Sequence, residues 1–292
     1  MRRYLDVSKR AFRGSPLFHL PFAAIAILLW SMSAAPLVLL AQTGFTRIYG
    51  SQDTDVPIPQ LVLPLGRQDA GALQELAAYR KAANITSWNG MQASGTFTNS
   101  AGVSNPARLT ILNGDHFRLD VQMEKGTRST RISGNSGKTT EIGGKSYGLP
   151  SLTARTGLLA FPKLLLSGFP SANISLIDRG QVRIGGQACH AITAEEAASL
   201  DDSVKSSREI AVTDLYFDSS SHLLVESAST VQVDSRDREL YLMVTKYGDY
   251  QRIGESLIPL TYSQTLNGQP QWTLQVNSPD LQPSIDETYF RF

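Results

Sequence analysis

The sequence predicts a mainly β fold of the α+β class, in which a curled antiparallel sheet or incomplete β-barrel is covered by short helices. After Trp88 most of the chain alternates between apolar and polar residues, which is the period of a half-buried strand. Turn sequences rich in glycine, asparagine and aspartate separate these runs, as in sequential hairpins. A sheet this wide is expected to curl or to close on itself.

The first 41 residues have the pattern of an export signal. Five basic residues lie within the first 13 positions, and an apolar run from Leu17 to Ala41 follows them. This order directs the rest of the chain out of the cytoplasm. The run is long for a cleaved signal and close to the roughly 20 residues that span a bilayer, so cleavage and retention both remain open. We expect an exported, periplasmic protein, tethered to the inner membrane by residues 17–41 if the segment is retained.

Residues 42–66 are expected to form a tether ahead of one β domain at residues 67–292. Three prolines lie between Val56 and Pro64, and proline favours extended backbone at its own position and at the preceding one. From Asp69 to Asn84 the pattern becomes helical. The apolar residues that define this helical face are Ala72, Leu76, Tyr79 and Ala83, with Leu73 and Ala77 alongside.

About ten strands should follow this helix. The clearest runs from Phe117 to Met123, where every odd position is apolar and every even one polar. Similar runs lie at residues 108–112, 127–133, 138–142, 173–179, 182–191, 209–217, 223–233, 239–247, 257–266 and 271–277. The interval from Ser151 to Phe169 interrupts them with one or two short apolar helices.

The composition and motifs exclude several classes of function. With 41% hydrophobic residues the chain can bury a core, and beyond residue 41 acidic residues slightly outnumber basic ones, so no nucleic-acid partner is expected. The single cysteine, Cys189, lies far from the apolar segment, which excludes a lipid-anchoring cysteine. No histidine or cysteine spacing fits a zinc site. We expect no metal and no cofactor.

No pair of residues in the sequence supports catalysis. The glycine-rich segment Ser133–Thr139 lacks the first glycine of a phosphate-binding loop. Cys189 and His190 are adjacent on a predicted strand, so they point to opposite faces and cannot act as nucleophile and base. We therefore expect a protein that is not an enzyme, with Cys189 as a buried thiol beside an exposed imidazole.

The C-terminal third resembles a known family. The residues that carry the resemblance are Asp214–Asp218, Lys246–Tyr250, Gly254, Ile258–Pro259, Asn277, Ile285–Asp286 and Phe290. Their order is similar to the end of the outer-membrane lipoprotein carriers, the LolA and LolB-like superfamily. The resemblance implies an incomplete antiparallel β-barrel with helices over its mouth, enclosing a cavity for acyl chains.

The predicted ligand site is a hydrophobic lid facing an apolar strand. The predicted lid residues are Leu158, Leu159, Phe161, Leu165, Leu166 and Phe169. The predicted facing residues are Phe117, Leu119, Val121 and Met123. Alternation alone does not say whether this strand set faces the cavity or an outer helix.

Two functions are compatible with these expectations. The first is a hydrophobic-ligand binding or carrier protein of the bacterial cell envelope, with a lipid or an acylated protein as its partner. The alternative is a non-catalytic envelope interaction or stress-sensing module of the same fold. Such a module would contact an envelope membrane protein and fill its concave face with its own side chains.

Overall fold

A computed structural model describes residues 67–84, 90–113, 116–134, 136–150, 153–154, 174–197, 210–232 and 240–292. The helices include α1 (Ala70–Ala83) and the short 3-10 helix η2 (Glu287–Phe290). The strands are β1 (Gly90–Asn99), β2 (Ser104–Leu112), β3 (His116–Met123), β4 (Gly126–Ser133), β5 (Ser136–Thr140), β6 (Ser146–Leu149), β7 (Ile174–Ile184), β8 (Gln187–Ala197), β9 (Ile210–Asp218), β10 (Leu224–Gln232), β11 (Leu240–Ile253), β12 (Ser256–Leu266) and β13 (Gln269–Asp280).

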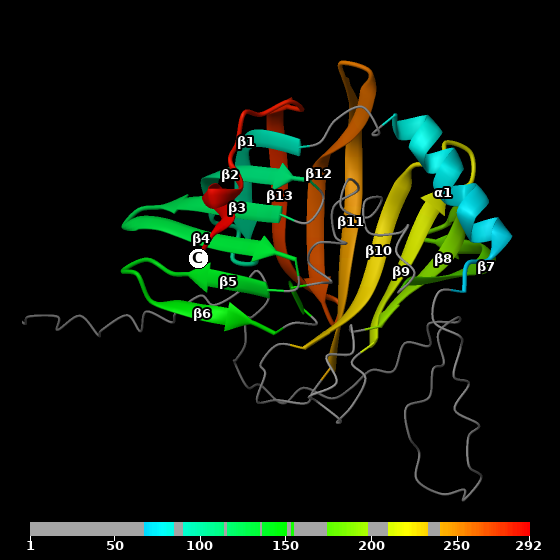
Figure 1. The fold of residues 1–292 in the computed structure, drawn as a ribbon, viewed down its shortest axis with the longest axis horizontal. Helices are drawn as coiled ribbons and strands as arrows, with labels where there is room; N and C mark the ends of the chain where they lie inside the picture. Colours follow the sequence, from blue (N-terminus) through cyan, green and yellow to red (C-terminus); the bar gives the residue numbers. More distant parts are fainter. Residues whose placement is uncertain are drawn as a thin grey trace, which may run out of the picture.

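These strands form one antiparallel sheet, which confirms the predicted mainly β fold. Its 13 strands lie in the order β6-β5-β4-β3-β2-β1-β13-β12-β11-β10-β9-β8-β7. The pairing of β1 with β13 joins the meander β1–β6 to the meander β7–β13. The edge strands β6 and β7 are not paired with each other, so the sheet is curled but not closed (Figure 1).

Most predicted elements are confirmed. The helix expected from Asp69 to Asn84 is α1, and Ala72, Leu76, Tyr79 and Ala83 are buried. Leu73 and Ala77, expected alongside them, are exposed instead. The run predicted at residues 182–191 is divided between two strands. Gly185 and Gly186 both adopt positive φ, a conformation that glycine tolerates best, so β7 ends before them and β8 begins after them. Each of the other predicted runs overlaps one strand.

The number of strands was underestimated because β1 and β6 have weak patterns. β1 carries a glycine, Gly95, where a Cβ atom would collide with the backbone carbonyl of Gln275 on β13. The close approach of the two backbones therefore requires glycine at this position. Its absent side chain interrupts the apolar alternation by which a strand is recognised.

One face of the sheet carries the main core, and we call it the inner face because α1 packs against it. A contiguous apolar cluster joins buried residues of α1 to residues of strands at both ends of the sheet. Phe117, Leu119 and Val121 belong to this cluster, and Met123 packs against it. The alternate residues of β3 point to the opposite face, toward η2. Among them, Arg118 contacts the ring and the backbone carbonyl of Tyr289. The predicted strand set therefore points to the inner face.

The predicted export segment at residues 1–41 and the predicted tether at residues 42–66 lie outside the described residues. In the part of the chain that the structure describes, no helix combines the length and the apolar character needed to cross a membrane.

Candidate functional site

α1 crosses the inner face and is attached at both ends. At its start, Asp69 N donates to Leu176 O on β7 at 2.9 Å. At its end, the Ser256 hydroxyl on β12 donates to Asn84 O at 2.7 Å. Four strands lie between β7 and β12 in the sheet. The five spacings between neighbouring strands, at roughly 4.8 Å each, give a path of about 24 Å along the sheet. The 14 residues of α1 measure about 21 Å. A straight helix reaches both strands because the sheet curves around it.

Four tyrosines gather beneath α1, and we call them the tyrosine cluster: Tyr79 on α1, Tyr247 and Tyr250 on β11, and Tyr262 on β12. The Tyr79 ring lies 5.4 Å from the Phe217 ring, and the rings of Tyr247 and Tyr262 meet edge to face at 5.9 Å. Burial raises the pKa of all four hydroxyls. They are therefore neutral hydrogen-bonding groups within an apolar surface.

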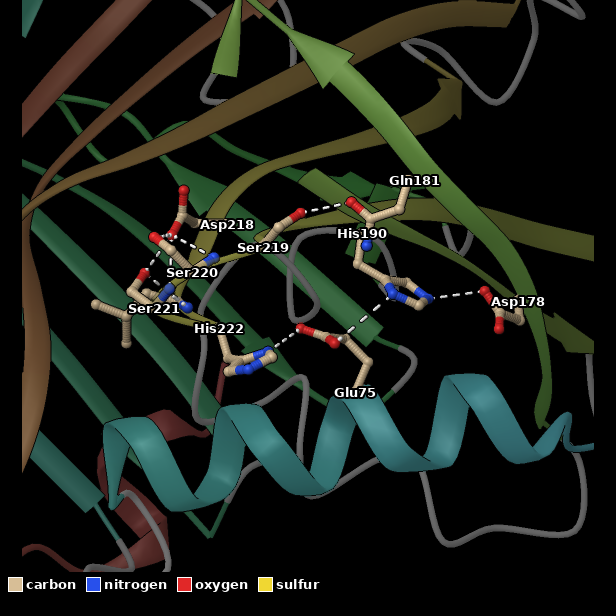
Figure 2. Close-up of polar contacts among 10 residues, drawn as sticks. Glu75, Asp178, Gln181, His190, Asp218, Ser219, Ser220, Ser221 and His222 are labelled. Carbon is tan, nitrogen blue, oxygen red and sulfur yellow. Dashed lines mark hydrogen bonds and ion pairs between the residues drawn. The ribbon is translucent and has the colours of Figure 1, made fainter. Parts of the chain in front are cut away.

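A polar group holds the middle of α1 to the sheet, as Figure 2 shows. Glu75 is the one charged residue among the buried residues of α1. Its Oε1 lies 2.9 Å from His222 Nδ1, and its Oε2 lies 3.7 Å from His190 Nδ1. His190 Nε2 in turn lies 2.7 Å from Asp178 Oδ1 on β7. We call Glu75, Asp178, His190 and His222 the Glu75 cluster.

The β9–β10 turn positions His222. Asp218 Oδ1 accepts hydrogen bonds from the backbone N–H and hydroxyl groups of Ser220 and Ser221. Hydrogen bonds from Ser220, Gln187 and Ser221 hold the pKa of Asp218 well below its usual range. His222 follows the turn at a φ of 57°, which points its ring toward α1 (Figure 2).

A break in the regular pairing positions Asp178. The register between β7 and β8 shifts between Asp178 and Gly180, which is the effect of a β-bulge. Gly180 N donates to Asp178 Oδ1 at 2.8 Å, and Asp178 N donates to Asp69 Oδ2 at 3.2 Å. The start of α1 and the Glu75 cluster are thus connected through one residue of β7.

The chemistry of the Glu75 cluster favours attachment over catalysis. A carboxylate only accepts hydrogen bonds, so His222 Nδ1 donates to Glu75 and His190 Nε2 donates to Asp178. Within the described residues, the side-chain hydrogen bonds of His190 and His222 both go to carboxylates, and neither imidazole is paired with a nucleophile. In the same residues no group of three or more His, Cys, Asp or Glu has the arrangement of a metal site.

The six predicted lid residues, Leu158, Leu159, Phe161, Leu165, Leu166 and Phe169, lie outside the described residues. Cys189 is buried, as predicted, in a small cluster on the outer face with Ala191 and Tyr216. Its neighbour His190 points to the opposite face, as alternation predicts. The predicted exposed imidazole is wrong, because only 19% of the His190 side chain is accessible beneath α1.

Sequence reasoning missed the Glu75 cluster and the tyrosine cluster. One signal for the first was present: Glu75 stands three residues after Ala72 and four before Tyr79, within the apolar face of the helix. A carboxylate at such a position needs a buried partner. Alternation in β8 and β11 indicates faces, but it does not say which strands lie beneath the helix.

Comparison with solved structures returns several matches of low sequence identity. A domain described as an outer membrane lipoprotein-sorting protein, from Vibrio parahaemolyticus, is 11% identical with a TM-score of 0.49 over 75% of this chain and 97% of that domain. A LolA superfamily protein from Nitrosomonas europaea is 10% identical with a TM-score of 0.45 over 76% and 97%.

A DUF1329 family protein from Desulfovibrio piger is 7% identical with a TM-score of 0.39, over 75% of this chain and 97% of that one. No protein-family model matches the sequence, and no curated protein matches it.

Proposed function

We propose that the protein is an exported carrier or binding protein for a hydrophobic ligand, a lipid or a lipoprotein acyl chain of the bacterial envelope. The observation that carries the proposal is the apolar cluster that runs across the inner face of the unclosed sheet under α1. An apolar ligand can replace side-chain contacts on such a surface without leaving a charge unpaired.

The location and the partners follow from the same proposal. The basic and apolar N-terminal segment directs the domain to the periplasm, and retention of residues 17–41 would tether it to the inner membrane. The partner is then a lipid or an acylated protein that meets the domain there. The predicted lid at residues 158–169 would cover the part of the inner face that α1 does not cross.

A non-catalytic interaction module of the same fold is the second candidate. It is favoured by the burial of Tyr79 and Tyr262, which are 0% and 1% exposed and fill the space under α1 with the protein's own side chains. In this case an envelope membrane protein would be the partner, and the inner face would act as a solid core.

Uptake of a fluorescent fatty-acid ester separates the two functions. The carrier predicts saturable, one-to-one binding by the purified protein. Two variants with matched burial report where the probe binds: Leu119→Ala on the inner face and Phe290→Ala on the outer face, both 1% exposed in the parent. Each substitution should lower the free energy of unfolding by about 2–5 kcal/mol, but only Leu119→Ala should change probe affinity. Absence of probe binding by the parent protein would favour the interaction module.

A further inference from the structure

The Tyr79 hydroxyl is a buried polar group that makes no hydrogen bond to the described residues. The side chain is fully buried on the inner face, and its Oη has no hydrogen-bond partner in the part of the chain that the structure describes. A buried hydroxyl without a partner is unfavourable, and natural proteins rarely keep one without a reason. This hydroxyl is therefore a place where a ligand atom could complete the structure.

The neighbouring hydroxyls already have partners. The Tyr250 hydroxyl donates to Leu224 O at 2.8 Å, and the Tyr247 hydroxyl lies 2.9 Å from Ser227 Oγ. Burial raises the pKa of Tyr79, and the nearby Tyr250 hydroxyl lowers it by a smaller amount. The two hydroxyls do not have the geometry of a hydrogen bond to each other. The proton of Tyr79 therefore remains available to an acceptor that enters beneath α1.

The charges nearby select the kind of acceptor. One helical turn before Tyr79, the same face of α1 carries Glu75, and Asp178 lies beyond His190. The four residues of the tyrosine cluster bring no positive charge. At this fully buried position an anionic group would lose its hydration and would find no cation within the tyrosine cluster. A neutral carbonyl oxygen accepts the Tyr79 proton without either difficulty.

We propose that Tyr79 Oη donates a hydrogen bond to the ester carbonyl oxygen of a bound acyl ligand whose hydrocarbon chain lies along the inner face. This inference rests on the proposed carrier function and adds its specificity-determining residue. The Tyr79 hydroxyl would favour acyl esters, the form in which acyl chains occur in lipids, over hydrocarbons of the same length and over free fatty acids.

Two probes and two variants test the assignment. The probes are the methyl ester of pyrene-labelled decanoic acid and decylpyrene, which has a similar chain without the carbonyl. Tyr79→Phe should weaken ester binding about tenfold, or about 1.4 kcal/mol, and leave decylpyrene binding within about twofold. The control is Tyr216→Phe, because Tyr216 is also buried but packs in the outer-face cluster with Cys189. It should change neither affinity.

The outcomes separate this inference from the function on which it rests. If the parent protein binds neither probe, the carrier function and the Tyr79 assignment both fail. If it binds both probes and Tyr79→Phe weakens them equally or not at all, only the Tyr79 assignment is overturned.

A second measurement uses the parent protein alone, so it does not depend on whether a variant folds. The infrared stretch of a ¹³C-labelled ester carbonyl should move to lower frequency when the ester binds the parent protein, as a hydrogen-bonded carbonyl does. A bound ester whose carbonyl absorbs as it does in alkane solvent would contradict the assignment.

Discussion

Glu75 is predicted to hold α1 on the sheet. Glu75→Ala removes the acceptor of the His222 N–H at 2.9 Å and the carboxylate 3.7 Å from His190. The Glu75 side chain is only 8% exposed, so water replaces these contacts poorly. One hydrogen bond to a charged group contributes about 1.5–3 kcal/mol. We therefore expect a loss of about 2–3 kcal/mol in the free energy of unfolding, which corresponds to roughly 5–10 °C in Tm for a domain of this size.

A double-mutant cycle isolates the Glu75–His222 contact. His222→Asn is the suitable partner variant because His222 has a positive φ, which asparagine tolerates. Urea unfolding of the parent, both single variants and the double variant should give a coupling free energy of about 1–2 kcal/mol. The exposed Glu124→Ala serves as the control and should stay within about 0.5 kcal/mol of the parent. A coupling near zero, with Glu75→Ala as stable as the control, would refute the role of the Glu75 cluster.

Three further results are expected. Burial raises the pKa of Cys189, so at pH 7 a thiol reagent should label it more slowly in the native protein than in urea, and Cys189→Ser should leave probe affinity unchanged. Burial also raises the pKa of Glu226. Because a raised carboxyl pKa means that the folded state loses stability as pH rises and the group ionises, Glu226→Gln should raise Tm at pH 7 and change it less at pH 4. Gly95→Ala would place a Cβ against the Gln275 carbonyl and should lower the unfolding free energy by about 1–3 kcal/mol, measured by urea unfolding.

Local patterns predicted the elements because local physics determines them. The apolar spacing in α1 and the alternation in β3 follow the helical and strand periods. The turns could be predicted in the same way. Asn113 and Asn267 occupy left-handed conformations at φ values of 53° and 47°, which asparagine adopts more readily than most residues.

Long-range pairing was not accessible from these patterns. The junction of β1 with β13 joins residues about as far apart as the domain allows, and no turn sequence marks it. The Glu75 cluster likewise unites three distant segments of the chain: α1, the β7–β8 hairpin and the β9–β10 turn. His190 was expected to be exposed because alternation places it on one face of β8 but does not show that a helix bearing a carboxylate covers that face. The lid at residues 158–169 stays a prediction.

Native mass spectrometry of the protein purified from its own membrane fraction tests the central claim most directly. The carrier function predicts a species heavier than the chain by the mass of one acyl lipid, which is released as an identifiable lipid on collisional activation. A single ligand-free species, from a preparation that also fails to take up the pyrene ester, would contradict the account.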